Sequence, residues 1–505
     1  MPRFTALSLA VAVLLLPALR GGNAQQPTVT YVSAGDVASS RMLPLTTRVA
    51  AARTHVIAGQ RALDAGLAPD AYAHFEQAVA ADSTFAFAHL GMAYSAPSLT
   101  AYREALTRAS RFAPRASRAE RLLIQIEERS LAEDLPGALA AAKELVRIAP
   151  RNPRAYTALA GVQSQLGKFT EARATLERAI VVDKQFAPAY IQLGNSYLLS
   201  EPRDMAKAET AIRKAVELEP NAYLPHDFLG DVYRATGRLA EARDAYTRAA
   251  ELAPTVGLER QQRGHVNTFL GNWDEARADY DAAIALSKDN GRATFAVYRS
   301  LVPIYQGHPR AAIDELEAVV AALDTMSVPD RDGGKVFALT QQFFIAAHTG
   351  AFDVAERALT RRSELARKRS AVLANADNRR AEEGTIAFLE GFLALKRGDF
   401  AAATAKANAA MTAVAANKNP RKNEGAHELL GLIALEQKNY ENALAHFAQG
   451  DPNNIYVTYY RALALEGAGR PAEAAPLLEK VATFHFNNTG LALVRADARA
   501  RLAKK

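Results

Sequence analysis

The sequence predicts an all-α protein, a solenoid built from stacked helix–turn–helix repeats. From about Ala50 onward it is rich in Ala, Leu, Glu and Arg, and its apolar residues recur with a period near 3.6. Strand patterns are nearly absent over the same stretch. The sequence also resembles itself at a spacing of 34 residues, which is typical of a repeat protein.

The N-terminus has the pattern of an export signal. A short basic start precedes an apolar run from Phe4 to Leu19, and small residues follow at Gly22 and Ala24. The run is shorter than the ~20 residues that a membrane-spanning helix needs. We therefore expect residues 1–24 to be a signal peptide, with an uncleaved anchor as the alternative. The mature chain should have no transmembrane segment and should act in a bacterial periplasm or outside the cell.

Residues 25–48 are polar and irregular, and we expect them to form a flexible tether. The repeats follow and are most regular in the middle of the chain. Equivalent positions 34 residues apart are Pro220 and Pro254, Gly230 and Gly264, Gly237 and Gly271, Ala242 and Ala276, and Tyr246 and Tyr280. The pattern predicts small residues where paired helices cross, a left-handed glycine between the helices, and proline after the second helix.

This pattern resembles the tetratricopeptide repeat family. The resemblance implies a right-handed superhelix whose inner wall is formed by the first helix of each repeat. Proteins of this family typically bind a peptide or a protein surface in that concave groove. The partner implied for this chain is therefore a protein or a peptide.

Looser copies of the repeat extend the array in both directions. Five downstream repeats are marked by Gly307, Gly350, Gly398, Lys438 and Gly469. We expect an N-terminal stack over residues 49–328 and a more divergent C-terminal stack over 336–489. Between them, the Pro- and Gly-containing stretch 329–335 is expected to be a loop or hinge. Residues 490–505 should form a solvated capping helix with a basic tail.

Composition and motifs argue against several classes of function. The chain has 505 residues, no cysteine and a formal net charge of +7. The lack of cysteine excludes disulfides, thiolate metal sites and cysteine nucleophiles. So mild a positive charge does not indicate nucleic-acid binding. No catalytic, metal-binding or cofactor-binding motif has the required spacing, so we expect neither an enzyme nor a bound cofactor.

The repeat register places a polar, partly acidic stripe on the inner wall. Its residues are Asn195, Asp227, Asp231, Gln261 and His265, and Arg263 lies beside them. Two interpretations remain open: a solvated wall with a structural ion-pair network around Arg263, or a patch that contacts a ligand. The family's carboxylate-binding mode does not fit, because Asp227 and Asp231 would repel a carboxylate. A basic or hydroxyl-rich partner would suit this stripe better.

The C-terminal stack is expected to have an aromatic inner wall. The same register points Phe344, Phe388, Phe392 and Tyr459 inward. An exposed aromatic row would mark a binding surface, whereas buried rings would be ordinary core, and the sequence leaves both possibilities open. Our hypothesis is that at least Phe388 or Phe392 lines an open groove.

The sequence therefore predicts a non-catalytic scaffold or adaptor that acts outside the cytoplasm through its concave groove. The main alternative is a carrier or sensor that holds a small or oligomeric ligand in the same groove. An enclosed pocket would favour this carrier, whereas an open groove would favour a protein partner. A more remote alternative is an enzyme with an unrecognised site around His265 and Asp231.

Overall fold

A computed structural model describes residues 41–287, 291–326, 328, 330–372, 376–417 and 419–504. Over these ranges the chain forms helices and turns and contains no strand, which confirms the all-α prediction. The expected signal peptide, 1–24, and residues 25–40 of the expected tether lie outside the described residues. Among the described helices, none combines the length and the apolar character that crossing a membrane requires.

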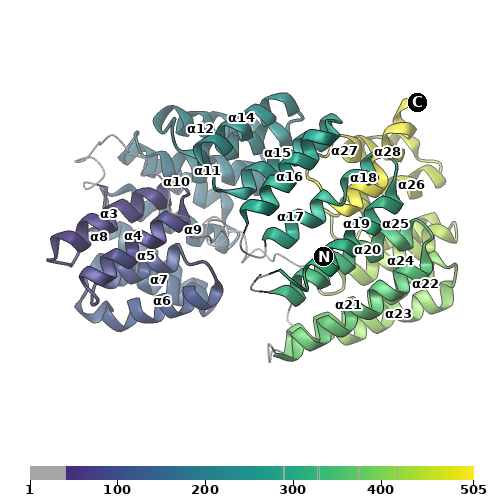
Figure 1. Cartoon of the computed structure of the whole chain (residues 1–505), viewed down its shortest axis with the longest axis horizontal. Coiled ribbons are helices and arrows are strands. Elements are labelled where there is room, and N and C mark those ends of the chain that lie inside the picture. The colour runs from purple at the N-terminus through teal and green to yellow at the C-terminus, as the bar shows by residue number, and fades with distance from the viewer. Residues whose placement is uncertain are drawn as a thin grey trace. The chain divides into compact units, whose positions relative to one another are not determined.

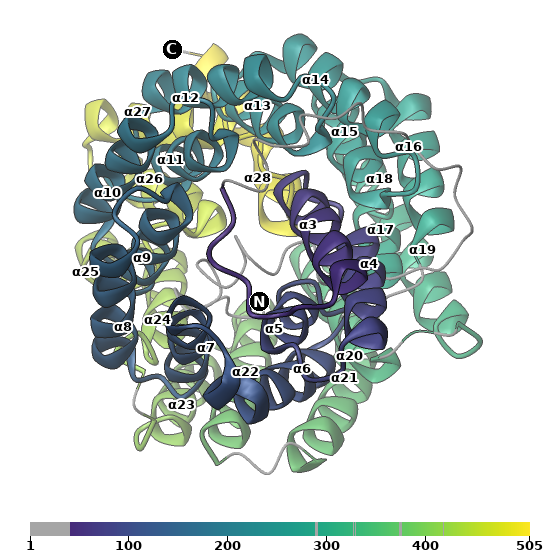
Figure 2. The same ribbon diagram turned by 90° about the vertical axis from the view of Figure 1, so that its left-hand side faces the viewer.

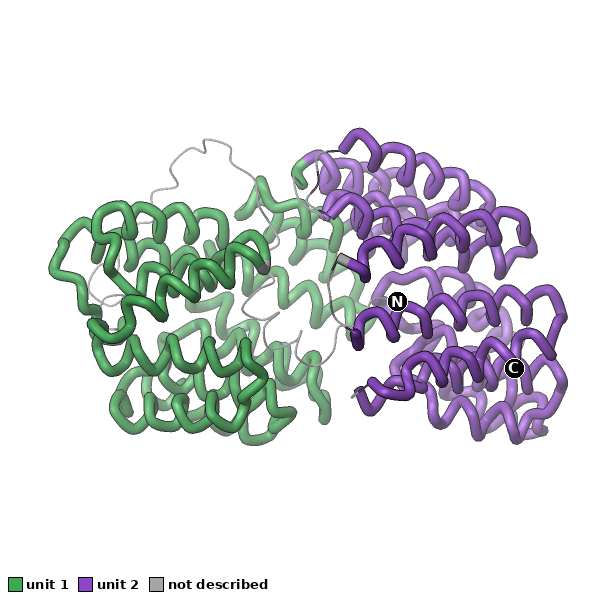
Figure 3. Tube along the Cα trace, turned by 90° about the horizontal axis from the view of Figure 1, so that it is seen from below, with its two compact units in different colours: residues 1–263, 286–289 green, residues 264–285, 290–505 purple. Residues whose placement is uncertain are grey.

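The structure divides into two compact units, which Figure 3 shows in different colours. Unit 1 lies within residues 1–263 and 286–289, and unit 2 lies within 264–285 and 290–505. The division therefore falls inside one helix, between Arg263 and Gly264. The break that we predicted at 329–335 is not where the units separate.

Unit 1 is a row of antiparallel helix pairs (Figure 1). The helices are α3 (Ala50–Asp64), α4 (Ala68–Ala81), α5 (Ala86–Tyr94), α6 (Leu99–Phe112), the 3₁₀ turn η2 (Ala113–Arg115), α7 (Arg118–Leu131), α8 (Leu135–Ile148), α9 (Pro153–Gln165), α10 (Phe169–Val182), α11 (Ala187–Leu199), α12 (Met205–Leu218), α13 (Tyr223–Ala235), α14 (Leu239–Leu252) and the start of α15 (Gly257–Leu270). Each pair packs against the next, as expected for a solenoid.

Unit 2 continues the same arrangement with less regular helices. They are the rest of α15, α16 (Trp273–Leu286), α17 (Gly291–Arg299), α18 (Val302–Tyr305), α19 (Pro309–Ala322), α20 (Arg331–His348), α21 (Phe352–Val372), α22 (Ala376–Lys396), α23 (Phe400–Ala413), α24 (Glu424–Glu436), α25 (Tyr440–Phe447), α26 (Ile455–Gly467), α27 (Pro471–Ala482) and α28 (Thr489–Ala503).

In most pairs, the turn between the two helices contains a residue with positive φ, as the sequence predicts. Gly237 and Gly271 have φ of 76° and 83°, and Gly307, Gly350, Gly398, Lys438 and Gly469 also have positive φ. Glycine adopts this conformation without steric cost, so it ends the first helix and reverses the chain. In the pair α7 and α8 this position is held by Glu133, which carries no sequence signal for it.

The two helices of a pair approach most closely at a glycine. A Cβ atom on Gly230 would lie 2.6 Å from Cε1 of Tyr246, whose side chain is fully buried. Gly264 meets Tyr280 in the next pair, with a corresponding distance of 3.1 Å. These contacts confirm the prediction that small residues mark the crossing points, where a larger side chain would force the helices apart.

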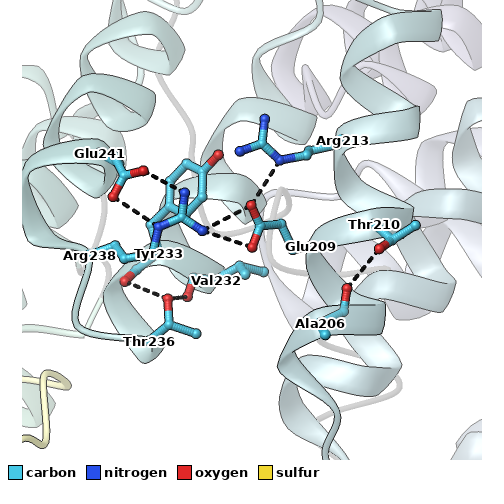
Figure 4. A network of polar contacts seen from close by, with 9 residues as sticks. All are labelled: Ala206, Glu209, Thr210, Arg213, Val232, Tyr233, Thr236, Arg238 and Glu241. Carbon is cyan, nitrogen blue, oxygen red and sulfur yellow. Dashed lines mark hydrogen bonds and ion pairs between the residues drawn. The ribbon is translucent and has the colours of Figure 1, made fainter.

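Charged side chains also connect neighbouring pairs. Arg238, in the turn before α14, donates to Glu209 of α12 at 2.9 Å and to Glu241 of α14 (Figure 4). Its guanidinium carbon lies 4.2 Å from the ring centre of Tyr233. Burial alone would raise the pKa of Glu209, but hydrogen bonds from Arg213 and Arg238 hold it below its ordinary value. The network is partly exposed, so it orients the repeats more than it stabilises them.

The prediction of a loop or hinge at 329–335 is wrong for residues 331–335, which form the start of α20. The carboxylate of Asp330 caps this helix by accepting a hydrogen bond from the Gly333 amide at 2.8 Å. A Cβ atom on Gly333 would lie 2.1 Å from that carboxylate. Gly333 therefore leaves room for the carboxylate that caps the helix. We interpreted the glycine as a sign of a loop, whereas it belongs to the first turn of α20.

The solvated capping helix predicted for residues 490–505 is also corrected. The observed helix, α28, buries Leu491, Val494 and Arg495. It packs against α26 and α27, as a cap would, but it also contacts α18 and α20, far back in the sequence. Figure 1 shows α28 close to α18, α26 and α27. This helix is therefore packed against other helices of unit 2 and is not a solvated cap.

The glycine contacts predict opposite effects of the same substitution at two helix positions. Gly230→Ala should destabilise the protein by about 1–3 kcal/mol, because its methyl group collides with Tyr246. Gly161→Ala, in α9, should stabilise it by up to about 1 kcal/mol, because no atom lies within 4 Å of the new Cβ. Urea unfolding followed by circular dichroism would measure both. Equal stability of the two variants would contradict the crossing-point assignment.

Candidate functional site

An extended stretch of the chain, residues 41–49, crosses the inner side of unit 1, and we call it the strap. It runs as a dark purple coil inside the curved row formed by α11, α9, α7 and α5 (Figure 2). Leu43 of the strap is 3% exposed and belongs to the apolar core of the unit. The prediction of a flexible tether for residues 25–48 is therefore wrong for residues 41–48. They are fixed by contacts that no local pattern indicates.

Asn152 holds the strap by its main chain. Its side-chain amide donates to the carbonyl oxygens of Arg41 and Met42, both at 3.2 Å. Its side-chain oxygen accepts from the Arg154 amide at 3.0 Å and so caps α9. One asparagine therefore orders both the helix start and the strap. Next to it, Arg41 forms an ion pair with Asp183 at 2.6 Å.

Glu120 provides the second anchor. It is fully buried and accepts from the Thr46 amide at 3.1 Å and from the Thr46 hydroxyl. The same carboxylate accepts from the Ser117 amide at 2.7 Å, which completes a capping box at the start of α7. The Ser117 hydroxyl donates to the carbonyl of Pro44 at 2.9 Å. A buried carboxylate with this many donors is well satisfied.

Asp82 anchors the end of the strap, where it accepts from the Thr47 hydroxyl at 2.6 Å. Partial burial alone would raise the pKa of Asp82. Hydrogen bonds from Thr47 and Thr84 outweigh that effect and hold its pKa below the ordinary value. The ionised form is thus the one that binds the strap.

The predicted polar stripe in unit 1 is largely buried. Asn195, Asp227 and Gln261 are 4–6% exposed. Asp231 accepts from Arg234 and from the Tyr246 hydroxyl, both at 2.6 Å. Arg234 thus pairs with Asp231, one of the two carboxylates on which we based the expected repulsion, and sequence reasoning missed this arginine because it lies outside the stripe.

Arg263 contacts a hydroxyl group of the preceding helix pair. Its guanidinium donates to the Thr247 hydroxyl of α14 at 3.3 Å. In unit 2, the carboxylate of Asp279 accepts from Asn267 at 2.9 Å. Arg263 therefore contacts the preceding helix pair of its own unit.

His265 is a packed residue of unit 2 and is 4% exposed. Its Nδ1 lies 2.6 Å from the Tyr280 hydroxyl and 3.2 Å from the side-chain amide of Asn487. The Tyr305 hydroxyl donates to the side-chain oxygen of Asn487 at 2.8 Å. This buried polar cluster joins α15, α16 and α18 to the segment that leads into α28.

The predicted aromatic wall is corrected at Phe392, which is 1% exposed and cannot line an open groove. Its ring packs against those of Phe343, Phe344, Phe388 and Tyr456. Phe344 and Phe388 are half-buried in the same cluster. The register is consistent with an inward orientation, because Phe392 of α22 meets Tyr456 of α26 two repeats away.

Tyr459 is likewise covered, at 6% exposure, and it donates to Asp497 of α28. Two basic groups lie in the aromatic cluster. The ammonium of Lys396 is 5.4 Å from the ring centre of Phe392, and burial lowers its pKa. Burial and the charge of Lys396 lower the pKa of His348 to about 4, so this histidine is neutral at pH 7.

The contacts of Asn152 predict that Asn152→Asp releases the strap but keeps the cap of α9. The carboxylate still accepts from Arg154, whereas it repels the carbonyls of Arg41 and Met42. Losing these hydrogen bonds should cost about 1–3 kcal/mol. Amide hydrogen exchange in residues 41–49 should accelerate. Asn439→Asp, at the cap of α25, is the matched control and should leave the strap protected.

Comparison with known proteins supports the repeat assignment. The tetratricopeptide repeat family matches residues 131–194, 224–256 and 455–480. No curated protein matches the chain.

Similar solved structures include three repeat proteins. One from Parabacteroides merdae is 18% identical, covers 55% of this chain and 98% of its own, and has a TM-score of 0.36. YrrB, described as having an unusual peptide-binding site, is 22% identical, with coverages of 36% and 91% and a TM-score of 0.30. MamA from Desulfovibrio magneticus is 17% identical, with coverages of 34% and 95% and a TM-score of 0.30.

The family matches fall in both units. Positive-φ turn residues and glycine crossing points also recur in both units, at Gly237 and Gly230 in unit 1 and at Gly271 and Gly264 in unit 2. The chain therefore contains tetratricopeptide repeats in both units.

Proposed function

We propose that the protein is a non-catalytic scaffold that binds extended segments of partner proteins along the inner side of unit 1. One observation carries this proposal: the unit already holds an extended segment of its own chain there. Asn152 and Glu120 bind carbonyl and amide groups of the strap, which almost every residue possesses. This binding mode is therefore not restricted to the strap's own sequence.

The strap also indicates the chemistry of a suitable partner. Its Arg41 meets the carboxylate of Asp183, and the hydroxyls of Thr46 and Thr47 meet those of Glu120 and Asp82. A partner segment with Arg or Lys beside Thr or Ser would suit the carboxylates on this side of the unit.

Two observations favour the scaffold over the alternatives. The carrier interpretation requires an enclosed pocket, but hollows of about 300 and 480 Å³ in the described residues are both open to solvent. The enzyme interpretation requires an accessible His265, but this side chain is buried against Tyr280 and Asn487.

The site of action follows from the N-terminal apolar run, and we propose export across the cytoplasmic membrane. The protein recovered from its native cells should begin near Gln25, because the small residues before it form a cleavage site. Mass spectrometry of the N-terminal peptide would measure this. A chain that still carries residues 1–24 would contradict cleavage.

Photo-crosslinking would test the scaffold. Gly161 lies 34 residues before Asn195 on the expected inner wall and has open space for a larger side chain. A benzophenone amino acid there should crosslink the full-length protein to a small set of partner proteins. The same group at Val181, which is 76% exposed on α10, is the control for random encounters. Identical products from both positions, or none from Gly161, would contradict the proposal.

A further inference from the structure

The C-terminal segment of unit 2, residues 483–503, occupies the inner side of that unit. We call this segment, which comprises Thr483–Asn488 and α28, the latch. Asn487 reaches His265 and Tyr280, which precede it by more than 200 residues. The Thr489 hydroxyl hydrogen bonds to the side-chain oxygen of Gln341 in α20 at 2.6 Å. The latch therefore contacts the first helices of early repeats, the wall that was expected to face a partner.

Helix α28 of the latch packs against the rest of unit 2 through one face, as a helix bound in a groove does. Leu491, Val494, Arg495 and Ala498 are buried and recur at intervals of three and four residues, so they form one face of α28. Asp497 and Arg501 lie at the border of this face, where they pair with each other and with residues of α26. The inner side of unit 2 is thus shaped to receive an amphipathic helix.

One residue of the buried face fits poorly. Arg495 is 3% exposed, and within the described residues no carboxylate pairs with it. Its Nε donates to the carbonyl of Ala482 at 3.2 Å, and its guanidinium lies 4.5 Å from the ring centre of Phe269. One Nη atom has no hydrogen-bond partner. Burial and the neighbouring Arg499 lower the pKa of Arg495 to about 10, so it still carries its charge at pH 7.

A buried charge without a counter-charge weakens the docked state, and an apolar side chain of similar size would fit the same place at lower cost. We propose that the inner side of unit 2 is a second protein-binding surface. The latch is its resident occupant. A partner's amphipathic helix, with an apolar residue in place of Arg495, displaces the latch. This proposal does not depend on the proposed function of unit 1.

Thiol labelling of the full-length protein would test whether the latch opens. Because the chain has no cysteine, one introduced thiol reports on one position. Ala498 in α28 and Ala462 in α26 are both fully buried, so Ala498→Cys and Ala462→Cys are matched variants. We expect the thiol in α28 to react at least ten times faster than the thiol in α26. Adding Arg495→Met should slow the reaction at position 498 at least threefold.

Equal rates at the two positions would overturn the proposal, because α28 would then open only together with the rest of the unit. An unchanged or faster rate after Arg495→Met would also overturn it. Hydrogen exchange of the unmodified protein provides the same comparison without any substitution. Amides of α28 should exchange faster than those of α26, and equal protection would count against the latch.

A synthetic peptide would test the surface itself. The probe is residues 483–503 with Arg495→Met and a fluorescent label, and the receptor is the full-length protein. We expect saturable binding, together with faster labelling of the Ala498→Cys variant as the resident helix is displaced. The control peptide adds Leu491→Asp and Val494→Asp, which remove the apolar face. Absence of binding, or equal binding of the control, would overturn the assignment of this surface.

Discussion

The close approach of two helices at a glycine is the contact on which the rest of the structure depends. Gly230 lies against Tyr246, and Gly264 lies against Tyr280, so an aromatic ring of the second helix covers the backbone of the first. This packing fixes how each helix pair is arranged, and stacking such pairs forms a curved row. The inner side of that row follows from the repeat, although no single repeat contains it.

In both units, part of this inner side is covered by a segment of the same chain. The strap crosses unit 1, and the latch, residues 483–503, lies in unit 2. Each buries apolar side chains, Leu43 in one case and Leu491 and Val494 in the other. Covering a wall with a segment of the same chain removes its apolar surface from water without the entropic cost of recruiting a second molecule.

The two segments differ in how their polar groups are compensated. The strap pairs each anchoring carboxylate with a donor, as Asp183 with Arg41 and Glu120 with Thr46. The latch satisfies Asn487 in the same way but buries the guanidinium of Arg495 without a carboxylate. Since an uncompensated buried charge is costly, the latch is the segment more easily exchanged for another occupant.

The sequence by itself determined the repeating unit, because its signals are local. Periodic apolar residues define the helices, and glycines such as Gly237 and Gly271 mark positions that require positive φ. It also predicted an inward position for Phe392. Only the tertiary structure decided whether an inward position is open, because distant segments of the chain can cover it. Asn487, for example, contacts His265, which lies 222 positions earlier, and no periodic pattern indicates this contact. Local patterns report on neighbouring turns and neighbouring repeats, whereas the covering of the inner walls depends on which distant segments return to them.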